Sequence, residues 1–271
     1  MHIDAQVTDR TGRVVTDLTQ TEFEVLDNGA RQKITSFERS SAPLDLLLLL
    51  DASGSMRPVI RAVAAEARAA VEQLHKGDRA SAMLFAANVR IVQELTEDTG
   101  RIGGAIGGGA TDPSLGGGTN TNAAILDGAK YLSSQAERGR RAILIITDNS
   151  GLNVRVPDER VIRTLLDNDT VLHGIIVGKN QRLPAVRPGS YVNPDYTEVD
   201  VPKIARATGG ETVQPNRVSE ALTSMIERIR QRYSMTYAAP GMDTRGYHRI
   251  DVRIPSRPEL IVKARQGYYA E

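Results

Sequence analysis

Hydrophobic residues are most concentrated at positions 44–50, a run of leucines interrupted by a single aspartate. A strand with one solvent-facing side alternates apolar and polar residues, whereas a strand buried on both faces of a parallel sheet does not. The pattern therefore predicts a central strand that is covered on both sides. The run stops at Asp51, which places a carboxylate where that strand ends.

The middle of the chain alternates between strand-like and helix-like patterns. A second strongly apolar run, at 140–148, also ends in an aspartate. The other predicted strands are 80–85, 89–95 and 171–177, and the predicted helices are 59–74, 120–135, 157–166, 201–208 and 218–232. This order is typical of an α/β fold with a doubly wound, mostly parallel sheet of Rossmann-like architecture and one antiparallel edge.

Both ends of the chain show alternating strand patterns. Residues 3–8, 23–26 and 32–38 form one set, with an Asp-Asn-Gly hairpin turn at 27–29, and residues 233–237, 250–254 and 260–264 form another. Three strands are a marginal unit alone, so we expect the two sets to combine into a small β-sandwich. The predicted organisation is an α/β domain at 43–232, inserted into a sandwich domain built from 1–42 and 233–271.

The composition and net charge of the chain limit the kinds of molecule that it can bind. The formal net charge is +1 over 271 residues, and aromatic residues make up 4% with no tryptophan. The chain thus lacks the positive field and the stacking residues on which nucleic-acid binding depends. The absence of cysteine excludes disulfides, thiolate metal sites and a cysteine nucleophile. We expect no nucleic-acid partner, and no segment in this sequence is apolar over the length needed to span a membrane.

Hydroxyl side chains follow the first apolar strand at alternate positions. Asp51, Ser53 and Ser55 form an Asp-x-Ser-x-Ser motif, and Gly54 allows the tight turn that aims the three side chains inward. Carboxylate and hydroxyl oxygens are hard ligands with little total charge, which suits Mg²⁺, with Ca²⁺ or Mn²⁺ as substitutes. The alternative is that Asp51 and Ser55 cap the helix that follows, since both residue types are good N-caps.

Two further segments bring oxygen ligands to the same edge of the predicted sheet. A glycine-rich stretch at 116–118 leads through Thr119 into a helix, and Asp148 ends the second apolar strand. The carboxyl ends of parallel strands meet at one edge, where open α/β sheets bind ligands. We therefore expect two carboxylates and three hydroxyls from three separate segments to converge there.

Together these residues resemble the von Willebrand factor A domain family, with its metal-ion-dependent adhesion site. The family motif is Asp-x-Ser-x-Ser, then a threonine from a glycine-rich loop, then an aspartate after an apolar strand. The matching positions are Asp51, Ser53, Ser55, Thr119 and Asp148. The resemblance covers residues 44–232 and implies a divalent metal held directly or through water by these side chains. Asn149 replaces a common glycine, but asparagine tolerates the left-handed conformation, so we expect the site to be retained.

The flanking segments resemble a second group of proteins. Residues 9–18, 23–29 and 263–270 are similar to the "VWFA-related" domain proteins abundant in acidobacteria, most of which are predicted to be exported and have no assigned role. This resemblance extends across nearly the whole chain. It implies a bacterial, extracytoplasmic protein, periplasmic or secreted, whose leader is absent from this sequence; a cytoplasmic location is the alternative.

The first resemblance also implies a function. In better-known relatives the metal engages an acidic side chain of the ligand, which implies a non-enzymatic adhesion or assembly module whose protein partner offers Asp or Glu. The alternative is a metal-dependent hydrolase that uses Asp51 and Asp148 to activate water. Haloacid dehalogenase-like phosphatases have a second Asp where this chain has Ser53. His173 lies in an apolar strand and is expected to be a core residue, so it does not supply a base.

Two segments rich in one residue type have simple structural interpretations. The glycines of 103–118 lack the Gly-Lys-Ser/Thr ending of a phosphate loop, and we expect them to lower the cost of moving the loop that carries Thr119. Arginines at 228, 230 and 232 lie in a predicted helix that also contains Glu220 and Glu227. We expect a solvated helix face that joins the two domains.

The segment 179–200 is a candidate partner-binding loop. It contains several prolines and follows the predicted strand 171–177, so it should emerge at the metal edge, where functional loops are common. The residues expected to border the partner are Arg187, Tyr191 and Tyr196. A surface insertion without function is the alternative.

Overall fold

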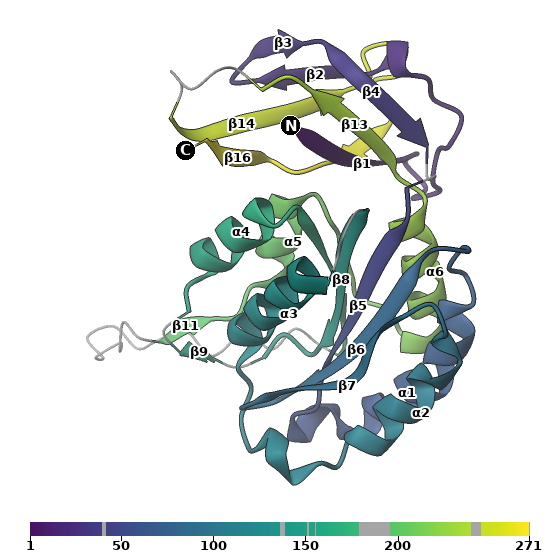
Figure 1. The fold of residues 1–271 in the computed structure, drawn as a ribbon, viewed down its shortest axis with the longest axis vertical. Coiled ribbons are helices and arrows are strands. Elements are labelled where there is room, and N and C mark those ends of the chain that lie inside the picture. Colours follow the sequence, from purple (N-terminus) through teal and green to yellow (C-terminus); the bar gives the residue numbers. More distant parts are fainter. Residues whose placement is uncertain are drawn as a thin grey trace.

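The computed structural model divides the strands of the protein between one central sheet and two terminal sheets. It describes residues 1–39, 42–135, 139–150, 152–154, 156–178, 196–239 and 245–270. Strands from the middle of the chain form a six-stranded sheet, and strands from both chain ends form two four-stranded sheets stacked at one end of it (Figure 1). The predicted fold class, a doubly wound α/β sheet with a small terminal β-sandwich, is confirmed.

The six-stranded sheet has the order β12-β10-β8-β5-β6-β7. Its strands are β5 (Leu44–Asp51), β6 (Arg79–Phe85), β7 (Val89–Thr96), β8 (Arg140–Thr147), β10 (Thr170–Ile176) and β12 (Thr212–Val213). All neighbours pair in parallel except β6 and β7, so β7 is the predicted antiparallel edge. β5 lies between β6 and β8, and each of its residues is buried.

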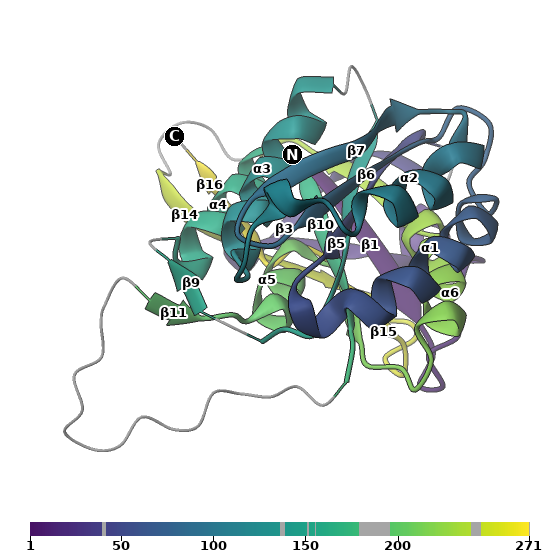
Figure 2. The ribbon, with the colours of Figure 1, turned by 90° about the horizontal axis from the view of Figure 1, so that it is seen from below.

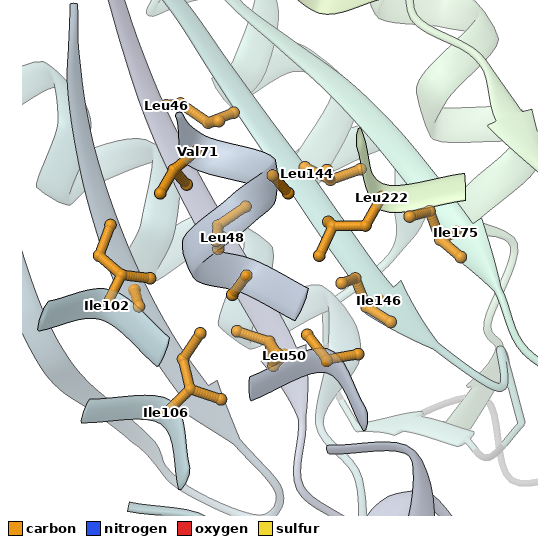
Figure 3. Packing of buried hydrophobic residues seen from close by; sticks show 14 of the residues in the cluster. Leu46, Leu48, Leu50, Val71, Ile102, Ile106, Leu144, Ile146, Ile175 and Leu222 are labelled. Atoms are coloured by element: carbon orange, nitrogen blue, oxygen red, sulfur yellow. The ribbon is translucent and has the colours of Figure 1, made fainter. Parts of the chain in front are cut away.

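Helices cover both faces of this sheet. One face carries α1 (Arg57–Val71), α2 (Ile102–Gly109) and α6 (Val218–Arg230), and the other carries α3 (Thr121–Gln135), α4 (Asp158–Asp167) and α5 (Val201–Thr208). Leu46, Leu48 and Leu50 face the first layer (Figure 3), whereas Leu47 and Leu49 face the second. Both the odd-numbered and the even-numbered positions of the leucine run are apolar because both faces of the strand are covered. Of the described helices, none has the length and apolarity needed to cross a bilayer.

Each sheet of the sandwich mixes strands from both ends of the chain. One sheet, in the order β15-β1-β13-β4, contains β1 (His2–Thr8), β4 (Ile34–Arg39), β13 (Tyr233–Tyr237) and β15 (Ile261–Lys263). The other, in the order β16-β14-β2-β3, contains β2 (Glu24–Asp27), β3 (Ala30–Gln32), β14 (Gly246–Arg253) and β16 (Gly267–Ala270). Neither end of the chain builds a whole sheet, so the sandwich forms only when both ends meet.

The hairpin turn between β2 and β3 forms as predicted. Asn28 and Gly29 both have positive φ, 47° and 84°, as a two-residue type I′ turn requires. The strand expected at 32–38 is instead divided, because β3 and β4 belong to different sheets. β4 ends at Arg39, β5 begins at Leu44, α6 ends at Arg230 and β13 begins at Tyr233, and the division into domains at 43–232 and at 1–42 with 233–271 stays a prediction.

The glycine-rich segment 102–109 is the helix α2, so the prediction of a movable loop is wrong there. A Cβ atom at Gly103 would lie 2.5 Å from the carbonyl oxygen of Ala64 in α1. At Gly109 it would lie 2.6 Å from the Val92 side chain. Gly103 and Gly109 therefore allow α2 to pack closely against its neighbours, which outweighs their low helix propensity.

The arginines of the last helix do not lie on a solvated face, so that expectation is also wrong. Arg230 is 5% exposed and forms a 2.8 Å ion pair with Asp78. Arg228 lies 3.3 Å from a Glu211 carboxylate oxygen. Their partners come from distant segments rather than from acidic residues of the same helix, which is why the local charge pattern was misleading.

A buried charged cluster joins the sandwich to the amino-terminal ends of the parallel strands. Arg140, the first residue of β8, donates its Nε–H to Asp4 of β1 at 2.8 Å. Arg232, 2% exposed, donates to the carbonyl groups of Asp4 at 3.0 Å and Gly209 at 2.7 Å. Burial alone would raise the pKa of Asp4, but the charge of Arg140 outweighs it and holds that pKa far below its ordinary value.

His173 of β10 borders this cluster and is fully buried, as predicted for a core residue. Its Nε2 atom lies 3.5 Å from Nη1 of Arg232. Burial and the positive charges of Arg232 and Arg140 place its pKa well below the ordinary value of 6.5. The imidazole is therefore neutral in the folded protein at neutral pH.

This neutral histidine predicts a pH-dependent stability. Below pH 6.5, His173 is protonated in the unfolded chain but stays neutral in the folded protein. Its contribution to the free energy of unfolding therefore falls as the pH decreases from 6.5 toward the pKa of the folded state. Between pH 7 and 5 the wild type should lose up to about 2 kcal/mol more unfolding free energy than His173→Gln. Urea titrations of both proteins at the two pH values measure this difference. Equal losses would contradict the prediction.

The packing of α2 predicts opposite effects for two adjacent glycines. Gly103→Ala should lower the unfolding free energy by about 1–3 kcal/mol, because the new methyl group collides with the α1 backbone. Gly104→Ala should raise it by about 0.5–1 kcal/mol, since no atom lies within 4 Å of its Cβ position and alanine favours the helix. Urea unfolding of the two variants provides the comparison, and the same sign for both would contradict it.

Candidate metal centre

The carboxyl ends of β5 and β8 lie next to each other at the edge of the sheet opposite the sandwich (Figure 1). Asp51, the last residue of β5, is fully buried. Its Oδ1 atom accepts the Ser53 N–H at 2.9 Å, and its Oδ2 atom accepts the Thr147 hydroxyl at 2.7 Å. The carboxylate at the end of the leucine strand thus has a fixed orientation.

A chain of contacts links Asp51 to Asp148 across the two strands. The hydroxyl oxygens of Ser53 and Ser55 lie 3.3 Å apart, and the Ser55 hydroxyl donates to Oδ2 of Asp148 at 2.7 Å. Ser53 is buried, Asp148 is half-buried and Ser55 is exposed. Four of the five predicted side chains therefore meet at a rim that is exposed to solvent at Ser55. Figure 2 views the fold from below, the side on which β5 ends.

Thr119 lies in the loop that leads into α3. The loop is attached to the end of β6, because the N–H of Asn120 donates to the Ala86 carbonyl at 2.8 Å and its side chain donates to Ala87 at 2.8 Å. Phe85, just before them, is the register partner of Asp51. The segment therefore approaches the same edge of the sheet, but the Thr119 hydroxyl forms no hydrogen bond with any described residue.

The alternative role of the motif in helix capping is wrong. α1 begins after Met56, and no side chain caps its amino terminus. The short turn Gly54–Met56 before it begins after Ser53, again without a side-chain hydrogen bond. Instead, Asp51 accepts a hydrogen bond from the N–H of Ser53, and the Ser55 hydroxyl donates one to Asp148 at the rim.

Two further residues, Thr147 and Ser150, hold the two carboxylates in place, and they were not predicted to do so. Thr147 donates to Asp51 and accepts the N–H of Asn149 at 3.1 Å. Ser150 donates both its N–H and its hydroxyl to Oδ1 of Asp148, at 3.0 and 2.6 Å. The signal for Ser150 was present in the sequence, because Asp148 and Ser150 repeat the Asp-x-Ser spacing of the first motif.

Asn149 adopts the left-handed conformation that was expected of it. Its φ is 53°, and its side-chain oxygen accepts the N–H of Val201 at 3.1 Å. Val201 is the first residue of α5, so this contact fixes the turn after Asp148 to the helix layer. Asparagine thus provides both the turn and a hydrogen bond that glycine could not make.

Within the described residues, no positively charged side chain pairs with either of the two carboxylates. Burial raises the pKa of Asp51, the hydrogen bonds from Ser53 and Thr147 oppose this rise, and the charge of Asp148 adds to it. In the described part of the chain neither Asp51 nor Asp148 forms an ion pair. A bound cation is the natural compensation for two such carboxylates.

The donor set fits a hard divalent cation. Two carboxylates and the neighbouring hydroxyls supply oxygen atoms alone, which is the preference of Mg²⁺ and Ca²⁺. Elsewhere too, the described residues contain no group of three or more His, Cys, Asp or Glu side chains able to hold a metal. Hydroxyl groups must therefore complete any metal site at this rim.

Sequence comparison identifies the part of the chain that carries these residues. Residues 46–151 match the family model of the von Willebrand factor type A domain. The chain contains a von Willebrand factor type A domain. The matched segment includes all five candidate ligands, and the family indicates a protein-interaction module. No curated protein sequence matches the chain significantly.

Solved structures share the fold of this A domain. The chain resembles the conserved hypothetical protein BatB from Bacteroides thetaiotaomicron with a TM-score of 0.52 and 19% identity, over 69% of this chain and 97% of that one. An aerotolerance-related membrane protein from Bacteroides fragilis gives 0.50 and 18%, over 69% and 98%. A von Willebrand factor type A protein from Catenulispora acidiphila gives 0.51 and 15%, over 92% and 62%. At these identities the likeness establishes the fold alone.

The candidate partner-binding residues lie largely beyond the described part of the A domain. Arg187 and Tyr191 fall outside the described residues. Tyr196 begins the short strand β11 (Tyr196–Glu198), which pairs antiparallel with β9 (Leu152–Val154). β9 follows soon after Asp148 in the chain, so the end of the predicted loop returns near the rim, and the role of the three residues stays a prediction.

The hydrogen bonds of Thr147 predict a large cost for removing its hydroxyl. Thr147→Val keeps the side-chain shape but removes two hydrogen bonds. The buried Asp51 carboxylate loses the hydroxyl that donates to it, and the N–H of Asn149 loses the oxygen that accepts from it. The unfolding free energy, measured by urea titration in a chelator, should fall by about 1–3 kcal/mol. Thr164→Val, which alters a hydroxyl on the surface of α4, should change it by less than about 0.5 kcal/mol. Equal effects would contradict the positioning role of Thr147.

Proposed function

We propose that the A domain is a non-enzymatic, divalent-metal-dependent protein-binding module for adhesion or assembly, whose metal site is completed by an acidic side chain of a protein partner. The observation that carries this proposal is the 2.7 Å contact between the Ser55 hydroxyl and the Asp148 carboxylate, which unites two strand ends at an exposed rim. The family match of residues 46–151 supports the interaction role. The resemblance of the flanks to exported proteins supports a periplasmic or secreted location.

The side chains proposed to hold Mg²⁺, or Ca²⁺ or Mn²⁺ in its place, are Asp51, Ser53, Ser55, Thr119 and Asp148. Thr147 and the Ser53 N–H keep the buried carboxylate in place, and Ser150 does the same for Asp148. When bound, the cation would supply positive charge that a carboxylate from the partner can contact. Because the rim is exposed at Ser55, that carboxylate can approach from solvent.

Recognition is favoured over hydrolysis by the surroundings of the carboxylates. The described hydrogen bonds of Asp51 and Asp148 go to hydroxyl and main-chain N–H groups. A hydrolase needs a general acid or base within reach of the reacting group, and such a base is most often histidine. Of the two most buried histidines, His173 borders the buried charged cluster around Asp4 and Arg232, and His248 lies in the sandwich.

Metal affinity is the first test. Calorimetry with Mg²⁺, Mn²⁺ and Ca²⁺ should detect binding to the wild type and a loss of about tenfold or more in Asp51→Ala and Thr119→Ala, because each removes an oxygen ligand. Ser114→Ala, an exposed serine near the same edge, should bind as the wild type does. Circular dichroism verifies that each variant is folded. Retained affinity in Asp51→Ala would remove the proposed site.

The Mn²⁺-loaded protein then tests the role of the partner's carboxylate. Water-proton relaxation enhancement should fall as N-acetyl-aspartate amide displaces metal-bound water, whereas N-acetyl-asparagine amide should leave it unchanged. An equal response to both probes would contradict recognition of a carboxylate. Metal-dependent hydrolysis of phosphoesters that disappears in Asp51→Ala would instead favour the hydrolase.

A further inference from the structure

A cavity of about 700 Å³ lies at the seam between the A domain and the sandwich. Residues of α5, of the turn that follows it, of β14 and of the segment from β15 to β16 line it. None of the five candidate metal ligands is among them. Its size is in the range of ligand-binding cavities, and its position is independent of the metal rim.

The cavity exists because the two sheets of the sandwich separate at this corner. β16 pairs with β14 only over residues 246–249. Before β16 the chain passes through 264–266 from β15, which belongs to the other sheet. Residues 250–253 of β14 therefore pair with β2 on one side and have no described strand on the other.

The register of β14 shows which main-chain groups face the cavity. Arg249 exchanges hydrogen bonds with Asn28 on the β2 side, whereas the N–H of Ile250 donates to Gln266 on the opposite side at 2.9 Å. Main-chain groups of successive residues in an antiparallel strand point alternately to the two sides. The N–H and C=O of Val252 consequently point into the cavity and form an open strand edge.

The charges that line the cavity are only partly compensated. Lys263 pairs with Glu211, and Asp251 pairs with Arg253 outside the cavity at 2.5 Å. Arg206 and Arg249 are exposed and, within the described part of the chain, have no carboxylate partner. An open strand edge is thus bordered by two free guanidinium groups, which suit carboxylates in bidentate geometry.

The walls of the cavity are held together by close backbone contacts. Gly209 has a φ of 86°, and a Cβ atom there would lie 2.4 Å from the backbone nitrogen of Arg265. The N–H of Gln266 donates to the Ala207 carbonyl at 3.0 Å. Because both domains contribute to a preformed site, little ordering is needed when a ligand enters.

We propose that this cavity binds an acidic peptide segment in an extended conformation. The segment adds as a strand to β14 at Val252, and its carboxylates pair with Arg206 and Arg249. Main-chain hydrogen bonds at a free sheet edge supply affinity in this mode of recognition, and the side-chain contacts supply selectivity. The site works without metal.

The test uses the whole chain and a short capped peptide in which Glu and Val alternate. Amide chemical-shift mapping should place the peptide at Val252, Arg249 and Val262. Arg206→Glu combined with Arg249→Glu should weaken binding by about tenfold or more, since two charge pairs become repulsive. The matched control combines Arg101→Glu and Arg160→Glu, two exposed arginines outside the cavity, and should keep wild-type affinity. Shifts elsewhere, or equal losses in both variants, overturn the proposal.

Two further experiments distinguish strand addition from simple anion binding and from binding at the metal rim. A peptide N-methylated at alternate residues cannot form the main-chain ladder and should not bind. Equal binding of this peptide, or displacement of the unmodified peptide by inorganic phosphate alone, would make the cavity a simple anion site and overturn the proposal. Binding should persist in chelator and in Asp51→Ala; its loss there would assign the peptide to the metal rim instead.

Discussion

The burial of β5 on both faces is the constraint on which the rest of the structure depends. Each leucine transferred from water to one of the two helix layers contributes about 1.5–3 kcal/mol, and none of them is more than 1% exposed. This burial fixes the strand between β6 and β8 and brings its last residue, Asp51, to the edge of the sheet. The cost of burying that carboxylate is offset by Ser53 and Thr147, whose donors also set its orientation.

Much of the fold and of the candidate site could be predicted because the signals are local. Apolar runs and helical periodicity indicated the strands and helices of the A domain, and parallel pairing then required Asp51 and Asp148 to share an edge. Thr147 escaped prediction because its role depends on reaching across to the neighbouring strand. A hydroxyl within an apolar strand has no spacing that distinguishes a positioning contact from an ordinary core threonine.

The failures of prediction have the opposite origin, in contacts between distant segments. The glycines of α2 have poor helix propensity, but Ile102 and Ile106 of this helix are fully buried in the core, and Gly103 and Gly109 allow it to approach Ala64 and Val92 closely. Arg230 and Arg228 have acidic neighbours in their own helix, yet they pair with Asp78 and Glu211. Tertiary packing overrides local preference at each of these positions. The sequence alone does not show that these distant segments lie close together in the fold.

The strand β8 connects the two polar regions of the molecule. Its first residue, Arg140, binds Asp4 in the buried seam, and its last residue, Thr147, binds Asp51 at the rim. A strand buried on both faces resists sliding, because a shift of one residue would turn each side chain to the wrong helix layer. The seam therefore helps to hold Thr147 and Asp148 in register with β5. On this argument the terminal sandwich contributes to a preorganised rim although it lies at the opposite end of the sheet.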